Sequence, residues 1–566
     1  MPTILVDLDD FYALVGDGYA PVRIEDDLEL VKGEFKGPDP TTGRTRIELN
    51  DTNRPDLWSA AGIARQIRAR RRGKVESHAA FTAAPGGKKI VADARGKDIR
   101  PYVAGFIARG PAVTEASLAE LIQSQEKLCD GYGAKRKTVS VGIYRAQKIT
   151  FPVHYRMVEP KSAKFVPLGM DDELDLAQIL EQHPKGKEYA HILQGKPLVP
   201  LLQDDAGQIL SFPPIINSRA IGEVVAGDTE LFVEATGTDL RSVLLVENIL
   251  AVDLEDRGWT IEPVVVEYPF DTPFGRDVRA PYPLTNEVEV PDADFNRLLG
   301  GALSADEIAK ELKAYGCDVA KGSAAGRTRV STQPYRQDYM HPVDAIEDLA
   351  VVVGVNKLEP VWPERFTPGR LARLTLLEDK VRELMIGLGF EEIIANVLCS
   401  KTDVTERLRL DGSDVVAIEN PMSESYAALR PTLLASLLAV EERSAKTAYP
   451  HRVFEVGEGV VRDDDENHLS RTEPLLGALV AHPEARFSDL HSVLSYVAFY
   501  LDVAIELRPL DRGCFLPGRG AELVLDGHGV GILGELHPEV LERWGVKMPA
   551  SFLELRLGAL PDALQG

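Results

Sequence analysis

The pattern of apolar and polar residues along this chain predicts a mixture of helices and strands. In residues 238–256 every third or fourth position is apolar, so we expect a helix that buries Leu240, Val243, Leu244, Val246 and Leu250. The same spacing predicts helices starting near Asp56 and over residues 114–130, 304–314 and 342–353. Ser304 followed by Glu307 is a capping box that fixes the start of one of them.

The C-terminal part of the chain alternates helical and strand patterns. Helices are predicted over 370–388, 430–445 and 488–502, and strands over 452–461, 475–481, 521–526 and 529–536. Proline marks two boundaries: residues 263–283 read as a linker, and Pro360, Pro363 and Pro368 form a second break. We therefore expect an α+β multidomain chain with modules at 1–85, 86–265, 275–355 and 360–566.

Composition adds that the chain is folded, acidic and without a disulfide framework. Of its 566 residues, 44% are hydrophobic and 27% are charged, with a net charge of −24. The four cysteines lie far apart in sequence, no apolar run is long enough to span a membrane, and the N-terminus is acidic. These features predict a cytoplasmic protein that makes no membrane contact.

The net charge alone argues against a nucleic-acid partner, because Lys and Arg drive phosphate binding. Binding responds to local patches, however, and basic residues concentrate at 65–74 and 135–148. We expect any nucleic acid to meet only this limited basic strip.

One glycine-rich string, Gly529 to Gly534, matches the dinucleotide-binding pattern. Asp526-Gly527 just before it is a hairpin-turn signal, and the next helix begins only near Pro538. The glycines are therefore predicted to lie in a β-hairpin. The sequence has no P-loop string and no zinc- or serine-hydrolase motif.

An acidic cluster stands at the start of the 342–353 helix. Its carboxylates are Asp338, Asp344, Glu347 and Asp348, the last three at spacings that share one side of a helix. Crowded carboxylates suit a hard cation such as Mg²⁺. The alternative is that acids near a helix N-terminus complement its dipole, which accounts for two of the four.

Several long strings resemble one family, the beta subunit of phenylalanine–tRNA ligase. They lie in the expected order over nearly the whole chain, at 48–59, 99–105, 121–128, 165–170, 183–191, 210–218 (LSFPPIINS), 236–239, 338–348, 420–422, 454–457, 515–519 and 534–538. Several of these strings are similar to the archaeal and eukaryotic cytosolic branch.

The resemblance implies an α₂β₂ ligase that joins phenylalanine to tRNA(Phe) with ATP and Mg²⁺, with the aminoacylation site on the alpha subunit. It implies an N-terminal α/β module, a β-rich domain that hydrolyses mischarged Tyr-tRNA(Phe), a small α/β module with the magnesium ligands, and a C-terminal antiparallel-sheet module like an inactive class II synthetase core. The magnesium ligands would be Asp338, Asp344, Glu347 and Asp348. The inactivity agrees with Ile532-Leu533 standing after Gly531, where such a core needs an arginine for ATP phosphate.

The same resemblance assigns the hydrolytic pocket to Leu202, Ser211, Asn217, Glu234 and Thr236. Buried polar groups that bond the extra hydroxyl of tyrosine would separate it from phenylalanine. With no activated nucleophile in the sequence, we expect a water to attack the ester, with Asn217 orienting it or the substrate. The simpler interpretation, that Ser211 and Thr236 cap turns, stays open.

The chain departs from the family pattern in one segment. Tyr144-Arg145 stands where a His-Asp pair is usual, and Cys129 and Ala134 replace polar or basic residues. These departures put the local contacts of residues 129–148 in question.

Two other functions compete with this interpretation: a free-standing hydrolase of mischarged tRNA, and a non-catalytic tRNA-binding assembly protein. The large 360–566 module without chemistry of its own disfavours the first. Loss of hydrolysis on changing Asn217 or Glu234 would separate editing from the second.

Overall fold

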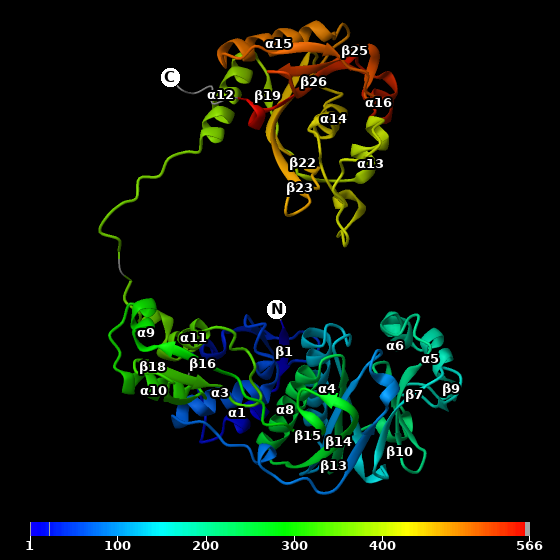
Figure 1. The fold of residues 1–566 in the computed structure, drawn as a ribbon, viewed down its shortest axis with the longest axis vertical. Coiled ribbons are helices and arrows are strands. Elements are labelled where there is room, and N and C mark those ends of the chain that lie inside the picture. Colours follow the sequence, from blue (N-terminus) through cyan, green and yellow to red (C-terminus); the bar gives the residue numbers. More distant parts are fainter. Residues whose placement is uncertain (1, 22, 361, 561–566) are drawn as a thin grey trace. The chain divides into compact units, whose positions relative to one another are not determined.

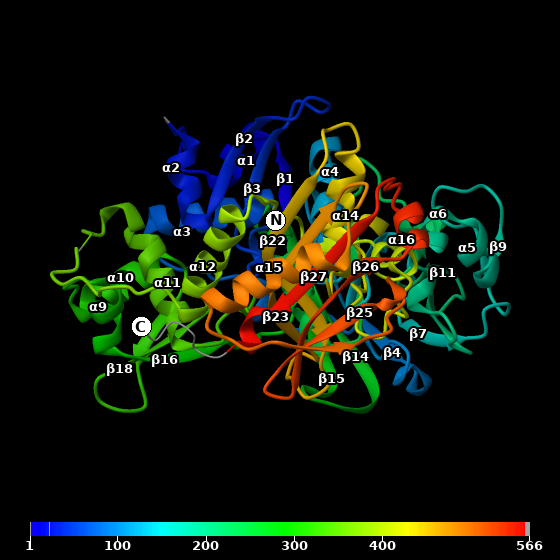
Figure 2. The same ribbon diagram turned by 90° about the horizontal axis from the view of Figure 1, so that it is seen from above.

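The computed structural model describes residues 2–21, 23–360 and 362–560 (Figures 1 and 2). The chain divides into two compact units, one ending at Trp362 and the other beginning at Pro363. Each unit is described by itself. Within the described ranges, no helix has both the length and the apolar character that crossing a bilayer requires.

The N-terminal unit begins with a small antiparallel sheet in the order β1-β3-β2, formed by Thr3–Val6, Thr45–Leu49 and Gly33–Pro38. Helices α1 (Leu8–Val15) and α3 (Ala60–Arg72) pack against each other. The helix expected from Asp56 begins four residues later, because Pro55–Leu57 forms a 3-10 turn and the Ser59 hydroxyl then caps α3 by accepting the Gly62 N–H at 2.9 Å.

A ten-stranded mixed sheet forms the centre of this unit. Its order is β12-β11-β10-β7-β4-β14-β5-β13-β6, with β15 paired to β14. The strands are β4 (Lys89–Ala92), β5 (Tyr102–Arg109), β6 (Val139–Arg145), β7 (Val153–Val158), β10 (Val199–Asp204), β11 (Ile209–Phe212), β12 (Ile216–Asn217), β13 (Glu230–Gly237), β14 (Thr260–Thr272) and β15 (Gly275–Ala280).

Helices surround this sheet and the small β8-β9 pair (Lys164–Phe165 and Leu174–Asp175). The predicted helix at 238–256 is confirmed as α8 (Leu240–Asp256), which packs on β5 and β13 (Figure 1). Four more helices of this region are α4 (Glu115–Lys127), α5 (Leu176–Gln182), α6 (Pro184–Tyr189) and α7 (Arg219–Gly222), whereas α2 (Ile24–Leu28) packs on β2 of the small sheet.

The linker predicted at 263–283 is wrong, since this segment forms most of β14 and all of β15. Pro263 pairs with Phe106 of β5, and the side chains of Val264, Val266 and Tyr268 are buried. Pro269 lies where the β14–β15 register is interrupted, so its missing N–H leaves no ladder bond unmade. Burial of alternate side chains along β14 therefore favours a strand here despite the prolines, which alone suggested a linker.

A third sheet, β16-β18-β17, is formed by Glu287–Pro291, Arg327–Ser331 and Asp318–Lys321. It packs with α9 (Asp292–Leu299), α10 (Ala305–Ala314) and α11 (Pro342–Val353) around one core. Both predicted helices are confirmed, and the Ser304–Glu307 capping box is present.

The C-terminal unit is built on a seven-stranded sheet, β19-β22-β23-β27-β26-β25-β24. Its strands are Glu391–Glu392, His451–Arg462, Ser470–Ala481, Ala550–Arg556, His528–Leu536, Phe515–Leu525 and Glu506–Pro509, in that order. A separate pair joins β20 (Leu398–Cys399) to β21 (Ala428–Leu429). All neighbouring pairs of the large sheet are antiparallel except β19–β22.

Two cores cover the two faces of this sheet. One contains α12 (Arg373–Gly387) and α15 (Phe487–Tyr500), and Figure 2 shows α15 crossing β23 and β27. The other contains α13 (Lys401–Val404), α14 (Leu434–Arg443) and α16 (Pro538–Arg543). The predicted helices and strands of this unit are thereby confirmed, with shifted ends.

The glycine-rich string lies in the β25–β26 hairpin, as predicted. Asp526 and Gly527 form its turn with positive φ values of 52° and 84°. Gly531 has no room for a side chain, since a Cβ there would lie 2.1 Å from the Glu554 carbonyl oxygen of β27. These glycines serve strand packing and do not open a helix.

Candidate active site in the N-terminal unit

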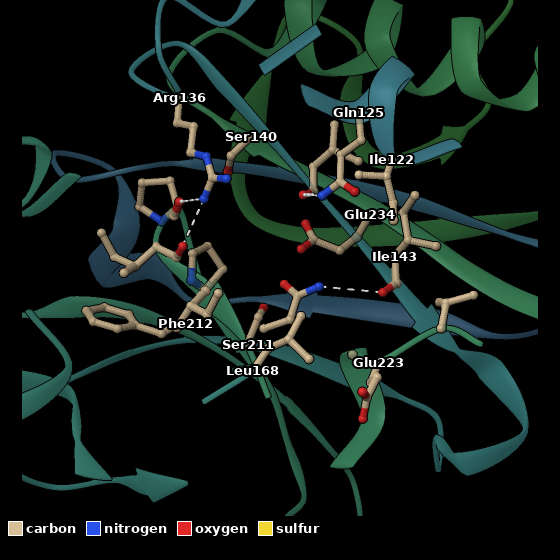
Figure 3. A pocket seen from close by; sticks show the side chains of 18 of the residues that line it. Ile122, Gln125, Arg136, Ser140, Ile143, Leu168, Ser211, Phe212, Glu223 and Glu234 are labelled. Carbon is tan, nitrogen blue, oxygen red and sulfur yellow. Dashed lines mark hydrogen bonds between the residues drawn. The ribbon is translucent and has the colours of Figure 1, made fainter. Parts of the chain in front are cut away.

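A cavity of about 370 Å³ lies where the two ends of the ten-stranded sheet approach each other (Figure 3). The end strands are β6 and β12, and Asn217 of β12 donates its Nδ2–H to the Ile143 carbonyl of β6 at 3.5 Å. The volume falls in the range of small-molecule sites.

The cavity combines an apolar wall with a small number of polar groups. The apolar part includes Leu118, Leu121, Ile122, Val141, Ile143, Leu168, Phe212, Pro213, Pro214, Ile215, Ile216 and Val224. The polar side chains are those of Gln125, Arg136, Ser140, Ser211, Asn217, Glu223 and Glu234. This composition is expected of a pocket that binds an aromatic or aliphatic group and forms hydrogen bonds with a polar group that it carries.

Three of the five residues expected in the hydrolytic pocket line this cavity: Ser211, Asn217 and Glu234. The other two lie outside it. Leu202 is fully buried on β10 and pairs with Ser211, so it supports the wall from behind. Thr236 is fully buried and accepts the Arg100 Nε–H at 2.9 Å; it does not cap a turn.

Glu234 is the most unusual group of the site. Its side chain is 3% exposed, and burial raises the pKa of its carboxyl group to about 7. One oxygen, Oε1, accepts the Tyr144 hydroxyl at 2.7 Å. The other, Oε2, is buried and has no hydrogen-bond partner among the residues that the structure describes. Figure 3 shows this carboxyl group directed into the space between Arg136, Ser140 and Ser211.

Tyr144 is central to the site, although the sequence marked it only as a departure from the family pattern. Its hydroxyl lies 2.8 Å from Ser211 Oγ and 3.4 Å from Asn217 Oδ1, besides its bond to Glu234. The ring is fully buried and stacks on Phe232 with centroids 5.9 Å apart. One phenol thus connects the polar groups from both ends of the sheet.

Gly142 makes room for this phenol. It pairs directly with Glu234 across β6 and β13, and a Cβ at this position would lie 2.1 Å from the Tyr144 oxygen and 2.5 Å from Glu234 Oε1. Glycine is therefore required here by close approach, a signal that the sequence alone did not provide.

Arg136 reaches the cavity from a strained turn. Ala134, Lys135 and Arg136 have successive positive φ values of 50°, 54° and 66°. The buried Arg100 guanidinium holds the turn by donating to the Arg136 and Lys137 carbonyls, each at 3.1 Å. Arg136 in turn donates to the carbonyls of residues 214 and 215, as Figure 3 shows.

The four carboxylates expected to bind magnesium do not converge. Asp338 and Asp348 both accept from Arg336 Nη2, at 2.7 and 2.9 Å. Although burial favours the neutral acid, the Arg336 guanidinium holds the pKa of Asp338 below its usual value.

The other two carboxylates serve different partners. Asp344 accepts the backbone N–H groups of Met340 and His341 at the start of α11, and Glu347 accepts Lys32 Nζ at 2.6 Å. Across the described ranges, no group of three or more His, Cys, Asp or Glu side chains is placed to hold a metal ion. The arrangement fits a cluster neutralised by Arg336, Lys32 and backbone donors, and does not fit a four-carboxylate magnesium site.

The basic cluster at 65–74 does not form the expected free strip. Arg65 and Arg68 are 3% and 7% exposed and pair with Asp256 of α8. Arg70 and Arg72 pair with Glu311 and Asp17. The prediction of a nucleic-acid surface here is wrong for the buried arginines, because acids distant in sequence neutralise them.

The basic residues beside the cavity are more accessible. Lys135 and Lys137 are exposed on the turn that carries Arg136. In the same segment Cys129 is buried and accepts the Val141 N–H at 3.3 Å, so it packs behind the site.

Two family descriptions match parts of the chain. Residues 360–557 match "Phenylalanyl tRNA synthetase beta chain CLM domain", and residues 288–355 match "tRNA synthetase B5 domain". The second match covers the sheet and helices that carry the acidic cluster.

Curated relatives and solved structures are similar to the chain, among them two beta subunits and an N-terminal fragment of a third. A phenylalanine–tRNA ligase beta subunit from Treponema pallidum is 42% identical over 91% of this chain and 86% of its own length. One from Borreliella burgdorferi is 38% identical over 99% of both chains. An N-terminal fragment of the beta subunit from Pyrococcus horikoshii has a TM-score of 0.58 at 34% identity and covers 62% of this chain and 99% of the fragment.

The source of these curated relatives differs from the archaeal and eukaryotic branch that the strings suggested. Both are bacterial, whereas the solved fragment is archaeal. The branch assignment is therefore not supported by the organisms of the curated relatives.

Proposed function

The chain belongs to the phenylalanine–tRNA ligase beta-subunit family, whose enzyme is an aminoacyl-tRNA synthetase acting as a complex, and from this premise we propose that its cavity edits tyrosine attached in error to tRNA(Phe). The edited bond is the ester between the tyrosine carboxyl carbon and the tRNA 3′-terminal ribose. Water adds to that carbonyl carbon, the ester C–O bond breaks, and tyrosine and the free ribose hydroxyl are released.

One observation carries the proposal: a buried carboxylate oxygen, which has no hydrogen-bond partner within the described part of the chain, faces an otherwise largely apolar cavity. Glu234 Oε2 would accept the phenolic hydroxyl of tyrosine, while the apolar wall holds the ring. Phenylalanine would leave this oxygen unpaired in a buried site, which penalises its binding. The cavity therefore has the chemistry to prefer tyrosine esters.

Asn217 is the residue proposed to orient the water or the ester. Its side chain lies at the cavity wall, where Nδ2–H donates to the Ile143 carbonyl and Oδ1 lies 3.4 Å from the Tyr144 hydroxyl oxygen. Positioning alone can provide much of the rate enhancement for an activated ester. Ser211 is engaged with Tyr144, so it supports recognition and is not proposed as a nucleophile.

The acceptor end of the tRNA is proposed to enter beside Lys135 and Lys137. Their exposed ammonium groups stand on the turn that carries Arg136 into the cavity. Phosphates of a single strand would meet positive charge there before the aminoacyl group reaches Glu234.

The C-terminal unit is proposed to be an inactive class II-like core that binds the alpha subunit in an α₂β₂ assembly. After Gly531 the strand continues as Ile532-Leu533, without an arginine for phosphate. Glu455 forms a buried ion pair with Arg430 at 2.7 Å. We assign Mg²⁺ and ATP to aminoacylation at the alpha-subunit site, in the cytoplasm, and derive no step through the acidic cluster.

The division into modules at 1–85, 86–265, 275–355 and 360–566 is a proposal, in which the boundary at 265–275 covers the second half of β14 and the turn into β15. We also propose that the chain resembles the archaeal and eukaryotic cytosolic type, for which its similarity to the Pyrococcus horikoshii fragment is the support, although the curated relatives named above are bacterial.

Replacing Asn217 with Ala in the complex with the alpha subunit tests the proposed function. We expect hydrolysis of Tyr-tRNA(Phe) to fall at least about tenfold, as for loss of one positioning group. Asn50→Ala, at an exposed position after β3, is the matched control and should keep the wild-type rate. Equal rates for Asn217→Ala and wild type would exclude this cavity as the editing site.

The same measurement separates the competing functions. A free-standing hydrolase would act without the alpha subunit and would not support aminoacylation when the two are combined. A non-catalytic assembly protein would bind tRNA, and neither wild type nor Asn217→Ala would hydrolyse the ester.

A further inference from the structure

We propose that Tyr144 is a specificity-determining positioning residue: its phenol occupies one oxygen of Glu234 and thereby presents the other to a hydroxyl group on the ligand. This inference rests on the proposed editing function and assigns a role that the family resemblance did not give. The ligand class is an ester of a para-hydroxylated aromatic amino acid.

The hydrogen-bond geometry around the phenol supports this role. The Tyr144 hydroxyl donates its single hydrogen to Glu234 Oε1 at 2.7 Å, so its oxygen is free to accept from Ser211 Oγ at 2.8 Å. Glu234 Oε2 is left buried and without a partner among the described residues. The carboxyl group is thus held at one oxygen only, and the cavity retains one acceptor for a ligand.

The strand register explains why the phenol can reach this position. Tyr144 pairs with Phe232 and Gly142 pairs with Glu234, so all four lie on one face of the β6–β13 ladder. Because Gly142 has no side chain, the ring of Tyr144 can extend along the strand to the carboxyl group. A Cβ at Gly142 would lie 2.1 Å from the phenol oxygen.

The location of the phenol behind the cavity wall distinguishes positioning from direct ligand contact. Tyr144 is fully buried and does not line the cavity, whereas Ser211, Asn217 and Glu234 do. Its hydroxyl touches all three, and these come from both ends of the sheet. Loss of the hydroxyl should therefore alter selectivity without removing a group that meets the ligand.

The test compares Tyr144→Phe with wild type in the complex with the alpha subunit. The readouts are the ratio of kcat/KM for Tyr-tRNA(Phe) to that for Phe-tRNA(Phe), and its dependence on pH. We expect the ratio to fall about three- to tenfold, as for loss of one hydrogen bond to a charged group. We also expect the midpoint of the pH dependence to move upward, because the Tyr144 hydrogen bond lowers the pKa of Glu234.

Tyr155→Phe is the matched control. Tyr155 is also a buried strand tyrosine of this sheet, and its hydroxyl donates to the Arg100 carbonyl at 2.9 Å without contacting Glu234. It should lose comparable stability yet keep the wild-type ratio and midpoint. A change of both readouts in Tyr144→Phe alone supports positioning, whereas equal changes in the two variants would overturn it.

The outcomes also separate this inference from the proposed function. If wild type hydrolyses Tyr-tRNA(Phe) and Tyr144→Phe keeps its ratio and midpoint, the role of Tyr144 is refuted while editing stands. If wild type does not hydrolyse Tyr-tRNA(Phe), the proposed function fails first. Should Tyr144→Phe aggregate, Gly142→Ala tests the same contact, and an unchanged ratio and midpoint there would overturn the inference.

Discussion

Replacing Glu234 with Gln is the substitution that most directly probes how the cavity recognises tyrosine. The change keeps the shape of the side chain but removes the possibility of negative charge at the buried oxygen. In wild type, Oε2 has no hydrogen-bond partner among the described residues, and Oε1 accepts the Tyr144 hydroxyl. The variant should therefore keep the cavity and weaken only the bond offered to a phenolic hydroxyl.

The expected magnitude follows from hydrogen-bond energies. A bond to a charged group contributes about 1.5–3 kcal/mol, against about 1 kcal/mol for a neutral one, so the loss is about 0.5–2 kcal/mol. This corresponds to a roughly 2- to 30-fold fall in kcat/KM for Tyr-tRNA(Phe). The value for Phe-tRNA(Phe) should be nearly unchanged, since phenylalanine offers no hydroxyl.

The pH dependence has a defined sign. Burial raises the pKa of Glu234 to about 7, so its ionised fraction rises from about a tenth at pH 6 to about nine tenths at pH 8. The wild-type selectivity for tyrosine should therefore increase through neutral pH. In Glu234→Gln no group titrates at this position, and the ratio should be flat.

The assay is deacylation of preloaded Tyr-tRNA(Phe) and Phe-tRNA(Phe) by the complex at several pH values. Taking the ratio of the two substrates cancels the general lability of aminoacyl esters in alkali. Glu506→Gln, an exposed change in the C-terminal unit, serves as the control. A Glu234→Gln complex with wild-type selectivity and the same pH dependence would refute recognition by this carboxylate.

Two further predictions concern other parts of the N-terminal unit. Arg336→Met should lower the free energy of unfolding of the N-terminal unit by about 3–5 kcal/mol, because Asp338 and Asp348 would be left buried without their guanidinium partner. Denaturant unfolding measures this change, and a decrease below about 1 kcal/mol would contradict the prediction. Replacing Lys135 and Lys137 with Ala should make the plot of log binding constant for tRNA against log salt concentration less steep by about 1.4. Each lost contact to a single-strand phosphate accounts for about 0.7 of this change in slope. An unchanged slope would remove the turn from the tRNA path.

Local sequence signals predicted the elements whose stabilising contacts are close in sequence. The α10 capping box and the Asp526-Gly527 hairpin turn each depend on residues within a few positions of one another. By contrast, the 263–283 segment is predicted as a linker although β14 and β15 pair with each other within it, and the other strand partners of β14, β4 and β5, lie more than 150 residues earlier. Pairing over such distances leaves only an alternation of buried valines in the sequence, which the prolines obscured.

Charge was the least predictable property. The sequence placed Asp338 near Asp348 correctly, but Arg336 pairs with both of them, while Asp344 and Glu347 bind backbone N–H groups and Lys32 instead. In the same way, Asp256 of α8 neutralises Arg65 and Arg68 of α3. The net charge of a segment does not show which oppositely charged residues, distant in sequence, will contact it in the folded protein.

The candidate cavity was partly predictable. Ser211, Asn217 and Glu234 came from the family resemblance, and the structure brings them together at the two ends of one sheet. Tyr144 was visible only as a departure from the pattern, because its contact with Glu234 depends on the absence of a side chain at Gly142. The role of Tyr144 can be inferred only when the cross-strand register, which places it beside Gly142 and Glu234, is known.

Accumulation of Tyr-tRNA(Phe) is the measurement that tests editing by this cavity most directly. The complex is supplied with tRNA(Phe), ATP and an excess of tyrosine, and the charged tRNA is followed over time. Wild type should accumulate almost none, whereas Asn217→Ala and Glu234→Gln should accumulate it while still charging phenylalanine at the wild-type rate. Equal accumulation in wild type and both variants would contradict editing at the cavity between β6 and β12.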